Sequence, residues 1–242
     1  MRNYLSYGGG VNSTAMLLLL LDEGWDFEAV YVDHGCDWPE TRNYVWWLSK
    51  QTPITIIRPD FRRNYKNKGG KTYNSLYDFC WDNEMVPHRV QRWCTQEFKT
   101  VPLQRYFKKP CYSLIGFSTD EAHRAKLDYK DGTEMRYPLL EYEVDRGGCK
   151  RIILEHGLPL PIKSGCYFCP FQRVNQFREL RMKHPDLFCK ATQLEKRNME
   201  RNKRVGKRIY TLKEGYGPLP ELVNENQGEL FEEYKPPCYC EL

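Results

Sequence analysis

A glycine run followed by hydroxyl side chains lies close to the start of this 242-residue chain. Residues 6–14 read Ser-Tyr-Gly-Gly-Gly-Val-Asn-Ser-Thr, between a short apolar segment (residues 4–5) and an apolar, Leu-rich run at residues 15–21. Successive glycines let the backbone turn sharply and bring its N–H groups against a phosphate. A helix that begins here would add the partial positive charge of its amino terminus. The pattern therefore predicts a phosphate cradle, and with it nucleotide binding.

The alternative interpretation is a tight turn in an ordinary α/β protein, which would not need three glycines together with two hydroxyl side chains. No Gly-Lys-Ser/Thr sequence follows, so the segment is not a Walker P-loop. The predicted cradle consists of Ser6, Gly8, Gly9, Gly10, Val11, Asn12, Ser13 and Thr14.

Cysteines provide the second chemical signal. Cys166 and Cys169 form a C-x-x-C pair, a spacing that lets two thiolates face one metal ion. Cys94 lies beside Arg92, and a cationic neighbour favours the thiolate form. Cys149 lies seventeen residues before Cys166, in a predicted helix at residues 145–156, and could be a fourth ligand. We therefore expect these cysteines to converge on one site, holding a [4Fe-4S] cluster or Zn²⁺.

The structural alternative is that Cys94 and Cys149 are small core residues, as free cysteine often is. In that case three-cysteine ligation of a cluster, with one open iron, remains an option. Cys238 and Cys240 form a C-x-C pair close to the last residue, and we interpret them as a sulfur relay or an unstructured end.

Length and composition set limits on the class of protein. A chain of 242 residues fits one α/β domain with an appendage. The longest apolar stretch, residues 15–21, is too short to span a bilayer, so we expect no membrane association and a cytoplasmic location. Ten cysteines without a secretory signal favour metal or redox chemistry over a disulfide framework.

Positive charge is concentrated in one segment. The net charge of the chain is only +5, but Arg173 to Arg208 holds twelve Lys or Arg against four Asp or Glu. A helical basic stretch of this density suits a phosphate backbone, so a nucleic-acid substrate is one interpretation. A solvated helical face is the alternative.

Strand and helix patterns alternate up to about residue 157 and become helical and charged afterwards. We predict a doubly wound parallel sheet of about five strands with the glycine loop at its centre, then a helical carboxyl-terminal segment. The domains would be residues 1–160 and 161–242. Residues 60–71 read as a surface loop or lid, and residues 91–107 as helical but interrupted by Pro102. The strands are expected at residues 4–5, 29–33, 54–58, 112–116 and 135–140, and a helix at residues 39–49.

Ligands of such sheets lie at the carboxyl ends of the strands. By sequence, four groups fall there: the glycine loop, residues 33–35, residues 92–99 and residues 116–124. We expect one cleft to be lined by all of them.

Several of these motifs are familiar in combination. Residues 8–13 resemble the S-G-G-x-D-S loop of PP-loop ATP pyrophosphatases, with Gly8 in place of Ser and Asn12 in place of Asp. Loss of that negative charge disfavours direct Mg²⁺ binding at Asn12. The other matching motifs, in chain order, are residues 39–41, 94–102, 114–124, 137–139, 157–159 and 166–170.

The series resembles the phosphoadenosine phosphosulfate (PAPS) reductase-like family, especially its short phage and prophage members, over roughly residues 3 to 172. For a phage protein the location would be the host cytoplasm. The family includes the sulfur-transfer subunits of DNA phosphorothioation systems and is related to tRNA thiolation enzymes. Several members hold a [4Fe-4S] cluster on cysteines placed like Cys94, Cys166 and Cys169.

The resemblance implies how ATP, with Mg²⁺, or a PAPS-like nucleotide would bind. The adenine would lie against the backbone near Val32 and Asp33, with Gly116 at the neighbouring strand end and the phosphates on the glycine loop. Lys99 and Arg124 would carry positive charge to the phosphates, and Cys94 would act near the reaction. Without the resemblance, Lys99 could be a solvated helix residue and Arg124 a salt-bridge partner of Glu121 or Asp120.

Three functions fit these motifs. The first is an ATP-dependent adenylating and sulfur-transfer enzyme that modifies a nucleic acid or nucleotide, with a cysteine desulfurase as a candidate sulfur donor. The second is a sulfonucleotide (PAPS) reductase that works with thioredoxin. The third is a non-catalytic, zinc-bearing nucleic-acid-binding protein, which Asn12 supports best.

Overall fold

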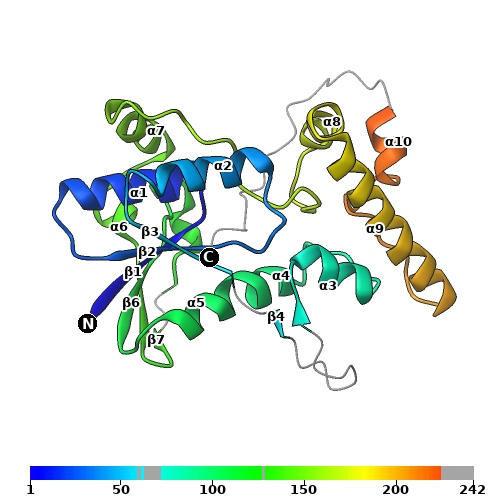
Figure 1. Ribbon diagram of the computed structural model, residues 1–242, viewed down its shortest axis with the longest axis horizontal. Helices are drawn as coiled ribbons and strands as arrows, with labels where there is room; N and C mark the ends of the chain where they lie inside the picture. Colours follow the sequence, from blue (N-terminus) through cyan, green and yellow to red (C-terminus); the bar gives the residue numbers. More distant parts are fainter. Residues whose placement is uncertain (59–60, 63–71, 127–128, 225–242) are drawn as a thin grey trace. The chain divides into compact units, whose positions relative to one another are not determined.

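The computed structural model describes residues 1–58, 61–62, 72–126 and 129–224, which form two compact units (Figure 1). The first unit contains the described residues in the ranges 1–58 and 98–165, and the second contains those in 61–97 and 166–224. The second unit thus combines a segment from the middle of the chain with described residues from 166 onward, so it is not continuous in sequence. Most of the predicted loop at residues 60–71, together with Cys238 and Cys240, lies outside the described residues.

A parallel sheet forms the centre of the first unit. Its strands are β1 (Arg2–Tyr7), β2 (Glu28–Val32), β3 (Ile54–Ile57), β6 (Cys111–Leu114) and β8 (Thr133–Arg136), in the order β3-β2-β1-β6-β8. All neighbours in that series pair in parallel, and β7 (Tyr129–Lys130) adds an antiparallel edge to β8. The predicted fold class is confirmed. The last strand was placed too late along the chain, because Pro138 begins a short helix, α6 (Pro138–Glu141).

Helices cover both faces of this sheet, as Figure 1 shows. One face packs against α1 (Val11–Asp22), α2 (Pro39–Leu48) and α7 (Arg146–Glu155), and the other packs against α5 (Val101–Tyr106). Alternate strand residues serve the two faces: Leu5 and Tyr31 face α1, whereas Tyr4 and Val30 face α5. Strands that are buried on both faces explain the nearly continuous apolar runs in the sequence.

Residues 93–106 show why the predicted helix is interrupted. A short helix, α4 (Trp93–Thr95), is followed by a wider turn (Gln96–Thr100) and then by α5. Pro102 lies in the first turn of α5, where its missing N–H costs no hydrogen bond.

The second unit is mainly helical. It contains α3 (Leu76–Asp82), α8 (Val174–Lys183), α9 (Pro185–Arg204) and α10 (Leu219–Asn224), with a small ribbon of β4 (Phe61–Arg62) and β5 (Thr72–Tyr73). The predicted helical carboxyl-terminal region is therefore confirmed. In the part of the chain that the structure describes, no helix is both long and apolar enough to cross a bilayer.

Candidate functional site

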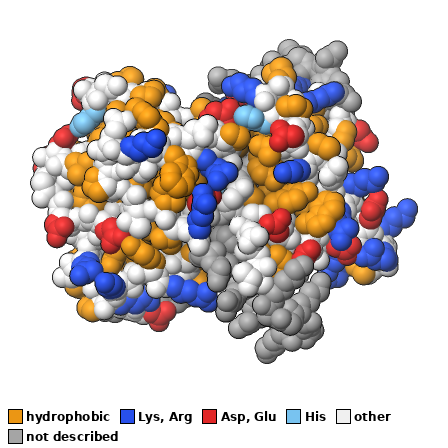
Figure 2. All heavy atoms as spheres, in the orientation of Figure 1, with side chains coloured by type: hydrophobic (Ala, Val, Ile, Leu, Met, Phe, Trp, Pro, Cys, Tyr) orange, Lys and Arg blue, Asp and Glu red, His pale blue; other side chains and the backbone are white. Residues whose placement is uncertain are grey.

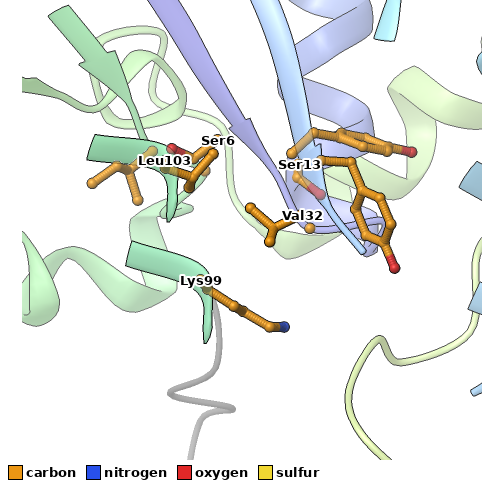
Figure 3. A pocket seen from close by; sticks show the side chains of 10 residues that line it. Ser6, Ser13, Val32, Lys99 and Leu103 are labelled. Atoms are coloured by element: carbon orange, nitrogen blue, oxygen red, sulfur yellow. The ribbon is translucent and has the colours of Figure 1, made fainter. Parts of the chain in front are cut away.

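A pocket opens in the first unit at the carboxyl ends of β1, β2 and β6, where parallel sheets bind ligands. In Figure 3 the Lys99 side chain extends toward the same space as Val32 and Ser13. Six of the predicted site residues, namely Ser6, Gly8, Ser13, Val32, Lys99 and Gly116, line this pocket. Sequence reasoning missed Tyr7, Tyr31, Leu103 and Ile115, which complete the lining and come from the same strand ends and from α5.

Two glycines shape the loop for different reasons. Gly9 has φ +70°, and a Cβ there would lie 2.7 Å from Cγ2 of Val45 on α2. Gly116 leaves room for the first turn of α1, since a Cβ at this position would lie only 3.3 Å from the Ser13 nitrogen. Gly10 is different: it caps α1 with φ −101°, a backbone conformation open to any residue. The glycine run thus brings the strand ends close to the amino-terminal N–H groups of α1.

Asn12 is held by the protein on both sides of its amide. Its Nδ2 donates to Oε2 of Glu121 (2.9 Å) and to Oγ of Ser118 (3.3 Å), while Arg146 donates to its Oδ1. An aspartate at this position could not donate to Glu121, and two carboxylates would face each other. Arg146 already places a positive charge at the oxygen of the Asn12 amide. The amide at residue 12 therefore fits this site without a metal ion bound to it.

Arg124 forms a salt bridge with Glu121, the alternative to phosphate binding that the sequence left open. It belongs to a tight helical turn (Thr119–Arg124), pairs with Glu121, and its guanidinium carbon lies 4.3 Å from the centre of the Phe117 ring. Its side chain is only 6% exposed. The pocket lining described above does not include Arg124.

Tyr31, His34 and Asp37 form a buried polar cluster, and Lys99 interacts electrostatically with its carboxylate. The Tyr31 hydroxyl donates to Oδ2 of Asp37 (2.5 Å), and Nε2 of His34 lies 3.2 Å from Oδ1 of Asp37. Burial by itself would raise the pKa of Asp37, but the charges of His34 and Lys99 and hydrogen bonds from His34 and Tyr31 outweigh it and lower that pKa. Burial and the nearby Asp37 raise the pKa of Tyr31. Lys99 of the pocket thus interacts electrostatically with a buried carboxylate whose pKa is lowered.

Asp37 was missed by sequence reasoning, although it follows the same strand end as Asp33. Asp33 itself is engaged by the protein: Oδ1 accepts the Gly35 N–H (3.0 Å), and Oδ2 pairs with Arg58 (3.0 Å) and Arg42 (3.4 Å). Because its side chain is committed in this way, backbone atoms at the end of β2 are what this position can offer to a ligand.

Two further loop residues, Val11 and Thr14, are buried in the first unit. The Thr14 hydroxyl lies 3.0 Å from the Tyr7 hydroxyl, and burial raises the pKa of Tyr7. They support the loop from the core side, and the pocket lining does not include them.

The C-x-x-C pair forms a rigid turn in the second unit. The Cys169 N–H donates to the Cys166 carbonyl (3.0 Å), and Nε2 of Gln172 donates to the carbonyls of Cys166 (3.1 Å) and Tyr167 (2.8 Å). Of the described cysteines, none is in a disulfide. Two cysteines held in one hydrogen-bonded turn are what a cluster or zinc ion requires.

Cys94 belongs to the same unit. The helix α3 packs against both the residue before Cys94 and the C-x-x-C turn. The Trp93 ring packs 5.6 Å from that of Phe79, and Phe168 packs 6.1 Å from Tyr77, centre to centre. Phe79 and Tyr77 are both on α3. The residue before Cys94 and a residue between the paired cysteines are thus anchored on one helix.

Cys149 has a different environment. It is on α7 in the first unit and is fully buried in an apolar cluster with Leu17, Leu20 and Ile153. The structure therefore places it as the small core residue that the sequence left as the alternative.

Comparison with known proteins agrees with the fold. A family model described as "Phosphoadenosine phosphosulfate reductase domain" matches residues 2–136. An uncharacterised protein of Methanocaldococcus jannaschii is 24% identical, with 79% of this chain and 47% of that protein covered. The chain thus spans about half the length of this curated relative.

A crystal structure of phosphoadenylyl-sulfate (PAPS) reductase from Candida auris, a phosphate complex, aligns with a TM-score of 0.48 and 17% identity, covering 66% of this chain and 75% of that one. The family match includes β1, the glycine loop, Lys99 and Gly116, and ends with β8. With more than half of its residues matched by the family model, the chain belongs to the phosphoadenosine phosphosulfate reductase domain family.

Proposed function

We propose that the first unit binds an adenine nucleotide and that the protein is an ATP-dependent adenylating and sulfur-transfer enzyme. The pocket carries the proposal, because it brings Gly8, the amino-terminal turn of α1 and Lys99 to the end of a parallel sheet. Phosphates are held by backbone N–H groups and a lysine in such sites. Family membership supports the nucleotide class, whereas the activity is our inference.

Different residues of the pocket would contact different parts of the nucleotide. Backbone atoms at Val32 would contact the adenine, and the loop from Gly8 to Ser13 would hold the phosphates. Lys99 would stabilise the charge that develops on the leaving pyrophosphate, an electrostatic contribution that depends on fixed positioning. Asp37 lies near Lys99 and would orient its ammonium group.

The proposed reaction balances without a redox step. An acceptor oxygen attacks the α-phosphorus of ATP, the bond to pyrophosphate breaks, and pyrophosphate leaves. A sulfide-level sulfur nucleophile then forms a bond to the acceptor carbon while the bond to the AMP oxygen breaks. Mg²⁺ would accompany ATP through its phosphate oxygens, since the amide of Asn12 is already engaged.

We further propose that Cys94, Cys166 and Cys169 hold a [4Fe-4S] cluster, with Zn²⁺ as the alternative. Their membership of one unit, the rigid C-x-x-C turn and the shared packing on α3 support this set. Cys149 is left out because it is a core residue of the other unit. A cluster with three cysteine ligands has one iron open, which would supply a site for sulfide.

Titration calorimetry tests the nucleotide site. Wild type should bind ATP, and Lys99→Met should bind it about ten- to a hundredfold more weakly, because one charge-assisted hydrogen bond is lost. The exposed Lys150 on α7 supplies a matched control, Lys150→Met, which should bind like wild type. If wild type binds neither ATP nor PAPS, the proposal fails.

A sulfonucleotide reductase is the second candidate, supported by the match to the reductase domain family. The two activities have different products. With PAPS and a thiol reductant, a reductase releases sulfite. With ATP, a sulfur donor and an acceptor, an adenylating enzyme forms AMP and pyrophosphate. Sulfite formation without any ATP turnover would favour the reductase.

A further inference from the structure

A second concave site lies entirely within the second unit. It is formed by the segment from Asn83 to Trp93, the carboxyl-terminal part of α9 and the segment from Lys207 to Glu214, and encloses about 790 Å³. This volume lies within the range of about 300–1,000 Å³ that is typical of ligand sites. We call it the α9 groove; its lining is Asn83, Glu84, Met85, Val86, His88, Val90, Gln91, Trp93, Asn198, Arg201, Asn202, Lys207, Arg208, Tyr210 and Glu214.

The groove lining carries three cationic side chains against two carboxylates. Among the described residues, Arg201, Lys207 and Arg208 form no ion pair. Of the two carboxylates in the lining, Glu84 is already engaged by arginines of α9, and Glu214 is the other. Figure 2 shows Lys and Arg side chains gathered where the carboxyl-terminal part of α9 lies, at the right edge of that view. The groove therefore favours an anionic ligand.

Aromatic and amide groups line the same groove. The rings of His88 and Tyr210 meet edge to face, with centres 4.9 Å apart, and the Arg208 guanidinium carbon lies 5.4 Å from the Tyr210 ring centre. Nδ2 of Asn202 donates to Oδ1 of Asn198 (3.3 Å), and Nδ2 of Asn198 donates to the Glu84 carbonyl (3.0 Å). The second of these bonds ties α9 to the segment that precedes Trp93, which helps to preorganise the groove.

We propose that the α9 groove binds single-stranded nucleic acid. Lysine and arginine suit phosphates, and aromatic rings suit the faces of bases. A concave site of this size admits unpaired nucleotides, whereas the bases of a duplex are stacked inside it and cannot reach the rings. An acidic peptide would use the cations but would leave the aromatic rings without a matching group.

The location of the groove connects it with the sulfur site. Trp93 lines the groove, and Cys94 is the next residue. A strand bound there would therefore contact the residue that precedes one of the proposed cluster ligands. In this respect the inference rests on the proposed function, because it names single-stranded nucleic acid as the substrate class of the sulfur transfer. Binding itself can be tested separately.

Fluorescence anisotropy with a labelled 12-nucleotide single strand, as DNA and as RNA, tests the groove. The variant Arg201→Ala/Lys207→Ala/Arg208→Ala should bind at least thirtyfold more weakly. The logarithm of its affinity should also depend less steeply on the logarithm of the salt concentration, with a slope smaller in magnitude by about 2. Each phosphate contact on a single strand contributes about 0.7 to this slope. The control, Lys190→Ala/Lys196→Ala/Lys203→Ala, removes three exposed charges from α9 outside the groove and should bind within about twofold of wild type.

Tyr210→Leu separates stacking from charge. It keeps every cation, so affinity should fall about tenfold while the salt slope stays unchanged. Competition with a duplex of the same sequence and with poly-glutamate should be at least tenfold weaker than with the single strand. Equal losses in the two triple variants, or equal competition by poly-glutamate or the duplex, would overturn the proposal. Thermal unfolding confirms that each variant is folded.

Calorimetry with ATP separates this proposal from that for the first unit. The groove variants should bind ATP like wild type, because the residues of the nucleotide pocket all belong to the first unit. If wild type binds the single strand through the groove residues but ignores ATP, the proposed function fails and the α9 groove stands. If it binds ATP but not the single strand, the groove assignment is wrong.

Discussion

Asp37 is a buried carboxylate whose charge the first unit maintains. Three side chains, His34, Tyr31 and Lys99, act on it from different elements, and together they outweigh the cost of burial. The carboxylate that results is fixed in place, so it can hold a neighbouring ammonium group in one orientation. Fixed charges close to a ligand pocket contribute to its electrostatic field.

We expect Asp37→Asn to lower the free energy of unfolding at pH 7 by about 1–3 kcal/mol, because the hydrogen-bond partners of the carboxylate lose a charged acceptor. The folded-state pKa of Asp37 lies below its ordinary value of 3.8, so its stabilisation is present above that value and is lost as the pH falls further. Urea unfolding between pH 7 and pH 3 should therefore show the difference shrinking in acid. The exposed Asp26→Asn is the control and should change little at either pH; a constant difference for Asp37→Asn would contradict the assignment.

At the scale of elements, the close packing of the glycine loop against α2 constrains the first unit. Gly9 combines a positive φ with a neighbouring side chain, whereas Gly24 has a similar φ of +67° and nothing within 4 Å of a Cβ. Substitutions at these two glycines can therefore separate the cost of backbone strain from the cost of a steric clash.

Gly24→Ala should cost about 1–2 kcal/mol of unfolding free energy from the left-handed backbone alone. Gly9→Ala should cost at least about 1 kcal/mol more, because its Cβ meets Val45 and α2 must shift. Chemical denaturation measures both, and calorimetry with ATP should show weaker binding for Gly9→Ala only. Equal stability of the two variants would mean that α2 moves aside without cost.

Glu195 stabilises a connecting segment of the second unit. Its two carboxylate oxygens accept the backbone N–H groups of Leu212 and Leu219, each at 2.7 Å, and so fix the segment between α9 and α10. Burial raises the pKa of Glu195, although the two hydrogen bonds oppose this. Its folded-state pKa thus exceeds the ordinary value of 4.5, and stability is lost as the pH rises through it.

Glu195→Ala should destabilise the protein by about 2–4 kcal/mol at neutral pH, because two buried N–H groups lose their acceptor. Glu195→Gln keeps one acceptor oxygen, so it should cost less and should remove the pH dependence described above. The control is Glu200→Ala, an exposed position of α9, which should cost less than about 0.5 kcal/mol. Thermal unfolding at pH 5 and pH 8 measures all three; a loss in Glu200→Ala equal to that in Glu195→Ala would refute the capping role.

For the whole molecule, the division into two units separates two kinds of chemistry. The residues of the nucleotide pocket belong to the first unit, and the three proposed cluster ligands belong to the second. Each property should therefore respond to substitutions in its own unit.

Cys94→Ser/Cys166→Ser/Cys169→Ser should lose bound iron or zinc and any visible absorption after purification without oxygen, because thiolates are the ligands. ATP affinity should stay within about twofold of wild type. Cys189→Ser is the control: Cys189 is exposed on α9, and this variant should keep the metal content of wild type. Metal analysis and calorimetry measure the two properties; full metal content in the triple variant would refute the ligand set.

Local interactions explain what the sequence by itself determined. The glycine loop, the apolar strands and the helix at residues 39–48 follow from backbone sterics and side-chain periodicity within a few residues. The parallel sheet then follows from the alternation of strands and helices. These features were predictable because each is specified by neighbours in the chain.

Contacts between distant residues are what only the tertiary structure decided. Arg146 bonds to Asn12 across 134 positions, Lys99 acts on Asp37 from another element, and Cys149 fills the core between α1 and α7. The α9 groove likewise joins residues near 90 to residues near 200. Such pairings depend on how the elements pack, and packing is set by shape and burial over the whole unit, which no short sequence pattern records.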